Sequence, residues 1–246
     1  MLSGLELLIA LFTVFVGATV MGTVSFGLAL VVAPVLLLFL APQSVVVLVN
    51  ILIVILLVFV LLRVRRHLDL GKISGMVLGG LAAVPIGVLA LRTADPTTLR
   101  ITIGIVILLL GVLVLFNVQI PLAQHRWAGP IFGFLTSLSI TTLSIGGPLA
   151  AIYVIAQKWP PPVMRASLAF FFLATYILAF VLYAAVGLLD LNVLANAGLL
   201  APGLLAGFGI ANLIVSRINE AVFRYVAIAV IITGSLVLLG REIVGA

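Results

Sequence analysis

The stretch Gly22-Thr23-Val24-Ser25-Phe26-Gly27 interrupts an apolar run that carries no charged residue from position 7 to position 62, and Pro34 follows it. A second charge-free run contains the similar stretch Thr141-Thr142-Leu143-Ser144-Ile145-Gly146-Gly147-Pro148. Both place small and hydroxyl-bearing residues where a membrane helix prefers leucine. Broken backbone is tolerated in a membrane only where protein or a water-filled cavity satisfies it. We therefore interpret them as two broken-helix sites, the first break and the second break, which face each other near mid-membrane.

The composition indicates an integral membrane protein. Of the 246 residues, 65% are hydrophobic and only 7% are charged, and the mean hydropathy is +1.50. Because charged residues make up roughly a quarter of a soluble domain, we predict an all-α bundle that lies almost entirely within the membrane. The net charge of +6 fits basic cytoplasmic loops, so we expect no nucleic-acid partner. The chain has no cysteine, which excludes disulfides and thiolate chemistry.

Turn-forming and charged residues divide the chain into helical segments. Pro42 follows the first broken unit, a basic cluster around Arg65 ends the next helix, and Pro160 begins a proline-rich turn in the second half. The expected segments are a broken unit at 5–40, helices at 44–62, 73–91 and 101–117, a second broken unit at 128–157, and helices at 163–187, 192–214 and 221–239.

The order of these features repeats, which predicts an internal duplication. We expect a first transmembrane repeat at 1–118, a linker at 119–127 and a second repeat at 128–246, each with a broken unit followed by three helices. The offset between matched residues drifts slowly along the chain. An offset of 119 residues aligns Ser25 with Ser144 and Pro42 with Pro161, 121 aligns Asp69 with Asp190, 122 aligns Gly87 with Gly209, and 124 aligns Arg100 with Arg224.

Two topologies fit this pattern. If each broken unit crosses the membrane once, as a long tilted helix with a kink, the lysines and arginines divide evenly between the two sides. If each unit enters and returns as a hairpin, the division is biased, which the positive-inside rule prefers. The hairpin topology also inverts the second repeat relative to the first. Its cytoplasmic side would carry Arg63, Arg65, Arg66, Lys72, Arg126, Lys158, Arg165, Arg217 and Arg224.

The breaks have the chemistry of an anion site. The first turn of a helix offers free N–H groups at the positive end of the helix dipole. We expect Ser25 and Ser144 to cap these turns, and glycine to let a ligand approach the backbone. The candidate substrate-binding residues are Gly22, Thr23, Ser25, Gly27, Asn50, Thr141, Thr142, Ser144, Gly146 and Gly147. We expect no catalytic residue, metal ligand or cofactor.

Helix packing is the competing interpretation of these residues, because glycine, serine and threonine also allow membrane helices to approach closely. Asn50 could equally form an interhelical hydrogen bond. Packing is the favoured role for the glycines outside the breaks. These are Gly79, Gly80, Gly87, Gly207 and Gly209.

These features resemble the TauE/SafE sulfite exporter family, also called the toluene sulfonate uptake permeases. The resemblance rests on residues 22–34 and 133–148, on the glycine-rich segment 79–87 and on the Leu99-Arg100 and Phe223-Arg224 helix starts, and it covers nearly the whole chain. The first break has Leu28-Ala29 after Gly27 where the family has a fuller glycine run. The resemblance implies transport of sulfite, sulfonates or sulfoacetate, usually as export from the bacterial cytoplasm.

The leading hypothesis is a secondary transporter of small sulfur-containing anions that works by alternating access. The alternatives are an anion channel lined by the same breaks, and a non-transporting scaffold or intramembrane enzyme. No nucleophile–base pair stands in the helices, which argues against an enzyme. We expect a multi-pass protein of the inner (plasma) membrane with its basic loops cytoplasmic. Its partners would be the anion and membrane lipid, and its wide lipid-facing surface would allow a homodimer.

Overall fold

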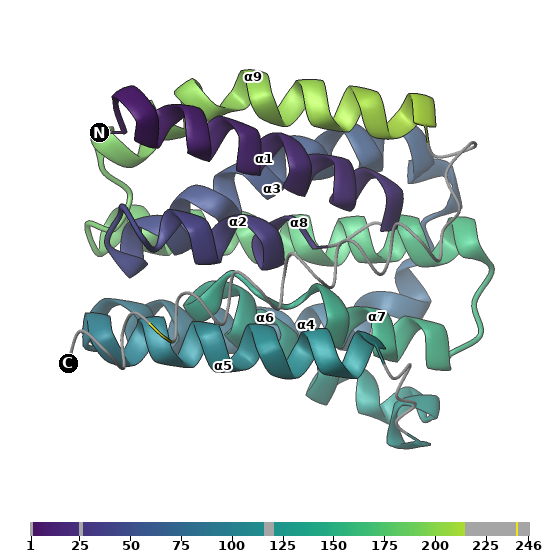
Figure 1. Cartoon of the computed structure of the whole chain (residues 1–246). Coiled ribbons are helices and arrows are strands. Elements are labelled where there is room, and N and C mark those ends of the chain that lie inside the picture. The colour runs from purple at the N-terminus through teal and green to yellow at the C-terminus, as the bar shows by residue number, and fades with distance from the viewer. Residues whose placement is uncertain (1, 25–26, 116–120, 215–239, 241–246) are drawn as a thin grey trace. The chain divides into compact units, whose positions relative to one another are not determined.

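The computed structural model describes residues 2–24, 27–115, 121–214 and 240. Within these ranges the chain forms helices and no strand, which confirms the predicted all-α class (Figure 1). The helix expected at 221–239 lies outside the described residues. The helices are α1 (Gly4–Val24), α2 (Leu28–Leu36), α3 (Pro42–Val64), α4 (Leu70–Thr93), α5 (Pro96–Leu115), α6 (Gly129–Leu143), α7 (Gly147–Ala156), α8 (Pro161–Ala185) and α9 (Leu191–Ile214), with 3-10 turns η1 (Arg65–His67), η2 (Pro121–Gln124) and η3 (Arg126–Ala128).

Several of these helices have the length and apolarity of a membrane span, because a crossing needs about 20 apolar residues. Together with the composition, they make the chain a multi-pass membrane protein. The spans within the described ranges are Gly4–Gly22, Pro42–His67, Leu70–Thr93, Pro161–Ala185 and Leu191–Ala211. The two short helices that follow the breaks, α2 and α7, have only 9 and 10 residues.

The chain reverses direction at both breaks. Gly17 lies against the first turns of α2, since a Cβ placed on it would be 2.8 Å from Val32 Cγ2. In the second half, the Phe132 ring stacks on the Tyr153 ring with centroids 5.6 Å apart, so the start of α6 meets the end of α7. Each broken unit is therefore a helical hairpin, and neither is a single kinked helix (Figure 1). The arms are unequal, because α1 is long enough to span a membrane and α2 is not.

The helices gather into two compact units. Unit 1 contains Met1–Leu52, Ala94–Asn117 and Asp190–Ala246, and unit 2 contains Ile53–Thr93 and Val118–Leu189. The boundary falls within α3, and neither unit coincides with one half of the sequence. Unit 1 pairs the hairpin of the first half with α9 from the second, and unit 2 pairs the hairpin of the second half with α4 from the first. The division into repeats at 1–118 and 128–246 stays a prediction about duplication.

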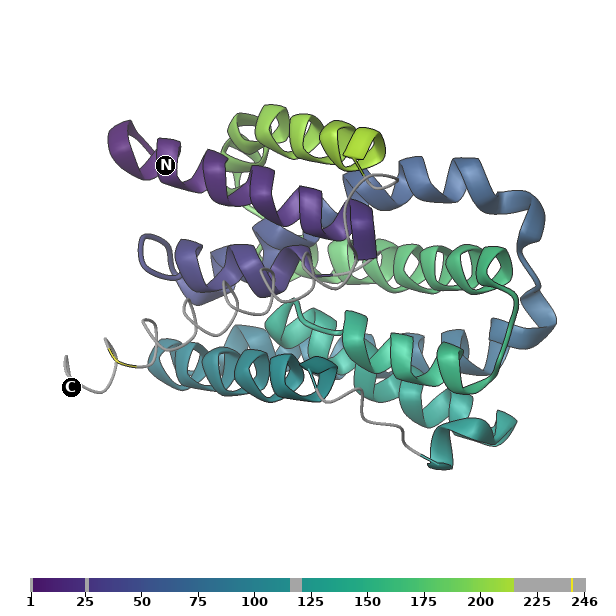
Figure 2. The same ribbon diagram turned by 45° about the vertical axis from the view of Figure 1, so that its right-hand side comes forward.

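In unit 1, α1 and α9 run side by side and in the same direction (Figure 2). A Cβ on Gly203 would lie 2.9 Å from the Leu11 carbonyl oxygen, and one on Gly207 would overlap the Phe15 carbonyl. Further along both helices, Gly22 lies against Ala211. The glycines therefore let two backbones touch, as is common in membrane proteins.

In unit 2, α4 and α6 pack in the same parallel manner. A Cβ on Gly79 would overlap the Pro130 carbonyl, and one on Gly87 would overlap the Thr141 side chain. These contacts match those of unit 1 under offsets of 119 for the hairpin and 124 for the glycine-rich helix. The Gly79–Pro130 contact then corresponds to Gly203–Leu11, and the Gly87–Thr141 contact to Ala211–Gly22. This correspondence supports the predicted duplication.

The packing role expected for the glycines outside the breaks is confirmed for Gly79, Gly80, Gly87 and Gly207. Gly209 is the exception, because no atom lies within 4 Å of a Cβ built on it. The alignment of Gly87 with Gly209 is therefore replaced by an alignment with Ala211, which occupies the equivalent crossing.

Candidate functional site

The two breaks have the same length and the same place in their hairpins. The first helix of the hairpin ends at Val24 or at Leu143, and the half-helix begins at Leu28 or at Gly147. An offset of 119 residues brings all four bounds into register. Residues 25 and 26 and the side chain of Thr23 lie outside the described part of the chain. The predicted roles of Ser25 and Thr23 therefore stay predictions.

Glycine, and not serine, caps both half-helices. Gly27 precedes α2 with a φ of 106°, in the left-handed region that favours glycine, and Gly146 precedes α7. The expectation that Ser144 caps α7 is wrong. Ser144 ends α6 in a left-handed conformation with a φ of 63°, and its N–H donates to the Ile140 carbonyl at 2.9 Å. Gly146 then follows where a Cβ would meet the Thr136 carbonyl oxygen at 2.8 Å, so no larger residue fits.

The first turns of α2 and α7 present backbone donors. Each ladder of hydrogen bonds begins at the capping glycine, with Val31 N–H donating to Gly27 at 3.3 Å and Ala150 N–H donating to Gly146 at 3.1 Å. The N–H groups that precede the ladder have no intrahelical acceptor. In α7 they belong to Gly147 and Leu149, because Pro148 has no N–H. Such a turn, at the positive end of the dipole, is suited to an anion.

The hydroxyls of Thr141 and Thr142 are already used within unit 2. Thr141 Oγ1 donates to the Ser137 carbonyl at 2.7 Å, and Thr142 Oγ1 donates to the Gly87 carbonyl at 3.2 Å. The Tyr183 hydroxyl donates to the Thr141 carbonyl at 2.6 Å and so satisfies a carbonyl of the last turn of α6. In this arrangement neither threonine has a proton free for an anion, although their role in binding stays a prediction.

Sequence reasoning missed a set of buried hydroxyls on α6 and α8. Ser137 and Thr175 share a hydrogen bond of 3.0 Å between their hydroxyl oxygens. Thr136 and Ser167 are fully buried, and their hydroxyls have no hydrogen-bond partner among the described residues. Leaving such a group unpaired costs about 1–3 kcal/mol. The spacing of Ser167, Phe171 and Thr175, four residues apart on one helical face, was the available signal for α8.

The remaining candidates lie in unit 1. Gly22 is used in helix packing against Ala211 and Phe208, Gly27 caps α2, and Asn50 is fully buried in the part of α3 that belongs to unit 1. The structure thus brings Thr141, Thr142, Ser144, Gly146 and Gly147 together in unit 2. Unit 1 holds the other three described candidates: Gly22 in α1, Gly27 at the start of α2 and Asn50 in α3.

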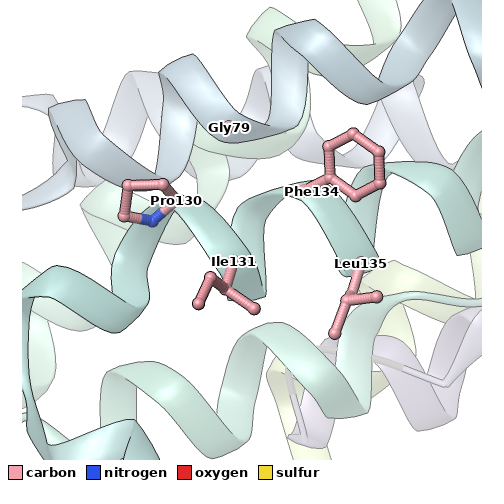
Figure 3. A pocket seen from close by; sticks show the side chains of 5 residues that line it. All are labelled: Gly79, Pro130, Ile131, Phe134 and Leu135. Carbon is pink, nitrogen blue, oxygen red and sulfur yellow. The ribbon is translucent and has the colours of Figure 1, made fainter.

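A groove on the α4–α6 pair has a different character (Figure 3). It has a volume of about 330 Å³, and its lining is Gly79, Pro130, Ile131, Phe134 and Leu135, without a polar side chain. Ile131 and Leu135 are exposed, as expected of a helix face turned to lipid. This groove offers no donor to an anion, so the candidate site is the break and not the groove.

Comparison with known proteins gives one result. The family model described as "Sulfite exporter TauE/SafE" matches residues 9–238, which include both breaks and both glycine-rich helices. Neither the curated proteins nor the solved structures that were compared gave a match. With a match over nearly its whole length, and with the membrane spans and paired hairpins described above, the chain belongs to the TauE/SafE sulfite exporter family of membrane transporters.

Proposed function

We propose that this protein is a secondary transporter that exports small sulfur-containing anions such as sulfite, sulfoacetate or other sulfonates. The observation that carries the proposal is the pair of matched breaks, each of which ends in a glycine-capped half-helix with backbone donors in its first turn. Oxyanions bind at helix N-termini through such N–H groups. Family membership supports a sulfur-containing anion as the substrate.

In this proposal each half-helix N-terminus lies near mid-membrane, and the two repeats have inverted topology. Inverted repeats with broken helices at their interface are a recurring design among secondary transporters. Movement of one repeat against the other would open the site to each side in turn. The protein would lie in the inner membrane, with the basic segments around Arg65 and Arg165 on the cytoplasmic side.

The test is flux of radiolabelled sulfite in proteoliposomes, with Gly147→Leu compared with the native protein at matched folded yield. Unit 1 has Leu28 at the equivalent position beside Gly17, whereas unit 2 has Thr136 there, so the flux is compared only at matched folded yield. The new side chain would cover the donors of α7 and lower the flux by about tenfold or more. Gly209→Leu is the control, because its surroundings are open.

Saturable native flux that unlabelled sulfite on the opposite side accelerates would identify a transporter. Flux that rises linearly with concentration, without such acceleration, would identify a channel. If Gly147→Leu keeps native flux, the anion does not bind at the second break.

A further inference from the structure

The second break has an unused side-chain donor. Thr136 on α6 is fully buried, and its Oγ1 has no hydrogen-bond partner in the described part of the chain. Its backbone is in direct contact with the break, since a Cβ on Gly146 would lie 2.8 Å from the Thr136 carbonyl oxygen. A buried hydroxyl without a partner is unfavourable in an empty protein, so its place beside the break suggests a bound group.

The matched position in unit 1 shows which way this residue faces. Under the offset of 119, Thr136 corresponds to Gly17. A Cβ on Gly17 would lie 3.3 Å from the Leu28 carbonyl oxygen and 2.8 Å from Val32 Cγ2, so this position of the hairpin faces the first turns of the half-helix. By this correspondence we expect the Thr136 side chain to face the start of α7.

The half-helices α2 and α7 differ in the size of the side chains at these matched positions. In unit 1, large side chains fill the space next to Gly17, and in unit 2 the matched residues are small. Leu28, Val31 and Val32 of α2 correspond to Gly147, Ala150 and Ala151 of α7. Unit 1 therefore closes this space with apolar packing, whereas unit 2 keeps room for a hydroxyl beside the free N–H groups of Gly147 and Leu149.

We infer that Thr136 donates its hydroxyl proton to an oxygen of the transported anion at the second break. The inference rests on the proposed function, and it adds a side chain to a site otherwise made of backbone. An oxyanion such as sulfite has several acceptor oxygens, so it accepts from two N–H groups and one hydroxyl together. The first break has no hydroxyl at the matched position.

The experiment combines thermal unfolding of the purified protein with sulfite titration, for the native protein, Thr136→Val and Ser167→Ala. Valine keeps the shape of threonine and removes its hydroxyl. We expect Thr136→Val to unfold at a higher temperature without anion, because an unpaired buried polar group is gone. We also expect it to bind sulfite about tenfold more weakly, the loss of one charge-assisted hydrogen bond.

Ser167→Ala is the matched control. Ser167 is also fully buried in unit 2 with an unpartnered hydroxyl, but it lies on α8, one turn before Phe171, which contacts Gly80. Its removal should not lower the unfolding temperature and should leave sulfite binding unchanged. Native binding retained by Thr136→Val, or equal weakening in both variants, would overturn the role of Thr136 while the proposed transport stands. A native protein that no sulfite concentration stabilises would overturn both.

Discussion

Units 1 and 2 each have one glycine at the equivalent helix crossing, but it stands on opposite helices. In unit 2 the glycine is Gly87 of α4, and it faces Thr141 of the hairpin. In unit 1 it is Gly22 of the hairpin, and it faces Ala211 of α9. The comparison teaches that a close crossing needs glycine on only one of its helices. A glycine pattern that alternates between halves is therefore compatible with a conserved geometry, which an alignment of glycines alone would miss.

The two halves of the sequence also differ in polarity. The second half carries Ser137, Thr175 and Tyr183 at positions that correspond, under the offset of 119, to Ala18, Leu56 and Val64 of the first half. All three unit 2 side chains are buried, and their hydroxyls form hydrogen bonds. The first hairpin and its neighbouring helix are apolar at the same places. Among the described residues, the second half thus has hydrogen-bonded hydroxyls at places where the first half is apolar.

The largest expected effect comes from filling the backbone contact that both units share. Gly79→Leu drives a side chain into the Pro130 backbone, and Gly203→Leu does the same against Leu11. We expect each change to cost at least about 3 kcal/mol and to abolish most of the monodisperse folded protein on size-exclusion chromatography. Gly209→Leu, in open space, should keep native yield. Normal yield for either buried variant would mean that the matched contacts are not needed.

A smaller effect is expected from exchanging the crossing residues of the two units. Gly87→Ala should cost about 1–3 kcal/mol through its clash with Thr141. Thr141→Gly should cost only about 0.3–0.5 kcal/mol in helix propensity. The double variant recreates the Gly22–Ala211 arrangement in unit 2. It should therefore be more stable than the sum of the single changes predicts, by about 1–2 kcal/mol, in a double-mutant cycle of thermal unfolding. If the free-energy changes of the two single variants simply add in the double variant, the helix crossings of units 1 and 2 are not equivalent.

The smallest effect concerns the aspartates that cap the two glycine-rich helices. Asp190 Oδ1 accepts from Val193 N–H at 2.7 Å, and Asp69 Oδ1 accepts from Lys72 N–H at 3.3 Å. Asp190→Ala should cost about 1 kcal/mol. Asp69→Ala should cost less, because its bond is longer and its Lys72 ion pair, at 3.2 Å, is exposed. Equal losses in chemical unfolding would show that the two caps have the same strength.

The stabilisation that Asp69 contributes should depend on pH. A hydrogen bond from the Lys72 side chain holds the pKa of Asp69 below its ordinary value. A carboxylate with a lowered folded pKa stabilises the protein above its unfolded pKa and loses that contribution as the pH falls through the folded value. The native protein should therefore lose slightly more stability than Asp69→Ala below about pH 4. An identical acid profile for both would remove this contribution.

Local chemistry explains what the sequence predicted correctly. Charged residues and prolines mark the ends of the helices, so the bounds of α3, α4, α8 and α9 agree with expectation to within a few residues. Asp69 and Asp190 each stand directly before a helix start, although the packing contacts align these two helices with an offset of 124. Glycine, serine and proline located both breaks, because these residues interrupt an apolar helix wherever they cluster.

Contacts between distant segments explain what was missed. Ser144 looked like an N-cap, but the cap depends on the left-handed turn that ends α6, which local propensity does not specify. The hydroxyls of Thr136 and Ser167 look ordinary in sequence, and only burial and the absence of a partner distinguish them. The pairing of α1 with α9 joins residues about 190 positions apart, beyond the reach of periodicity.

Each unit contains helices from both halves of the sequence, and this determines which unit can be completed first during synthesis. Of the described helices, α1 is synthesised first, and its partner α9 is the last to leave the ribosome. Unit 2 has all of its described helices once α8 has emerged, whereas in unit 1 the helix α1 lacks its main partner until α9 follows. The unit that contains the N-terminus is thus the later of the two to close, the reverse of the usual order of folding during translation.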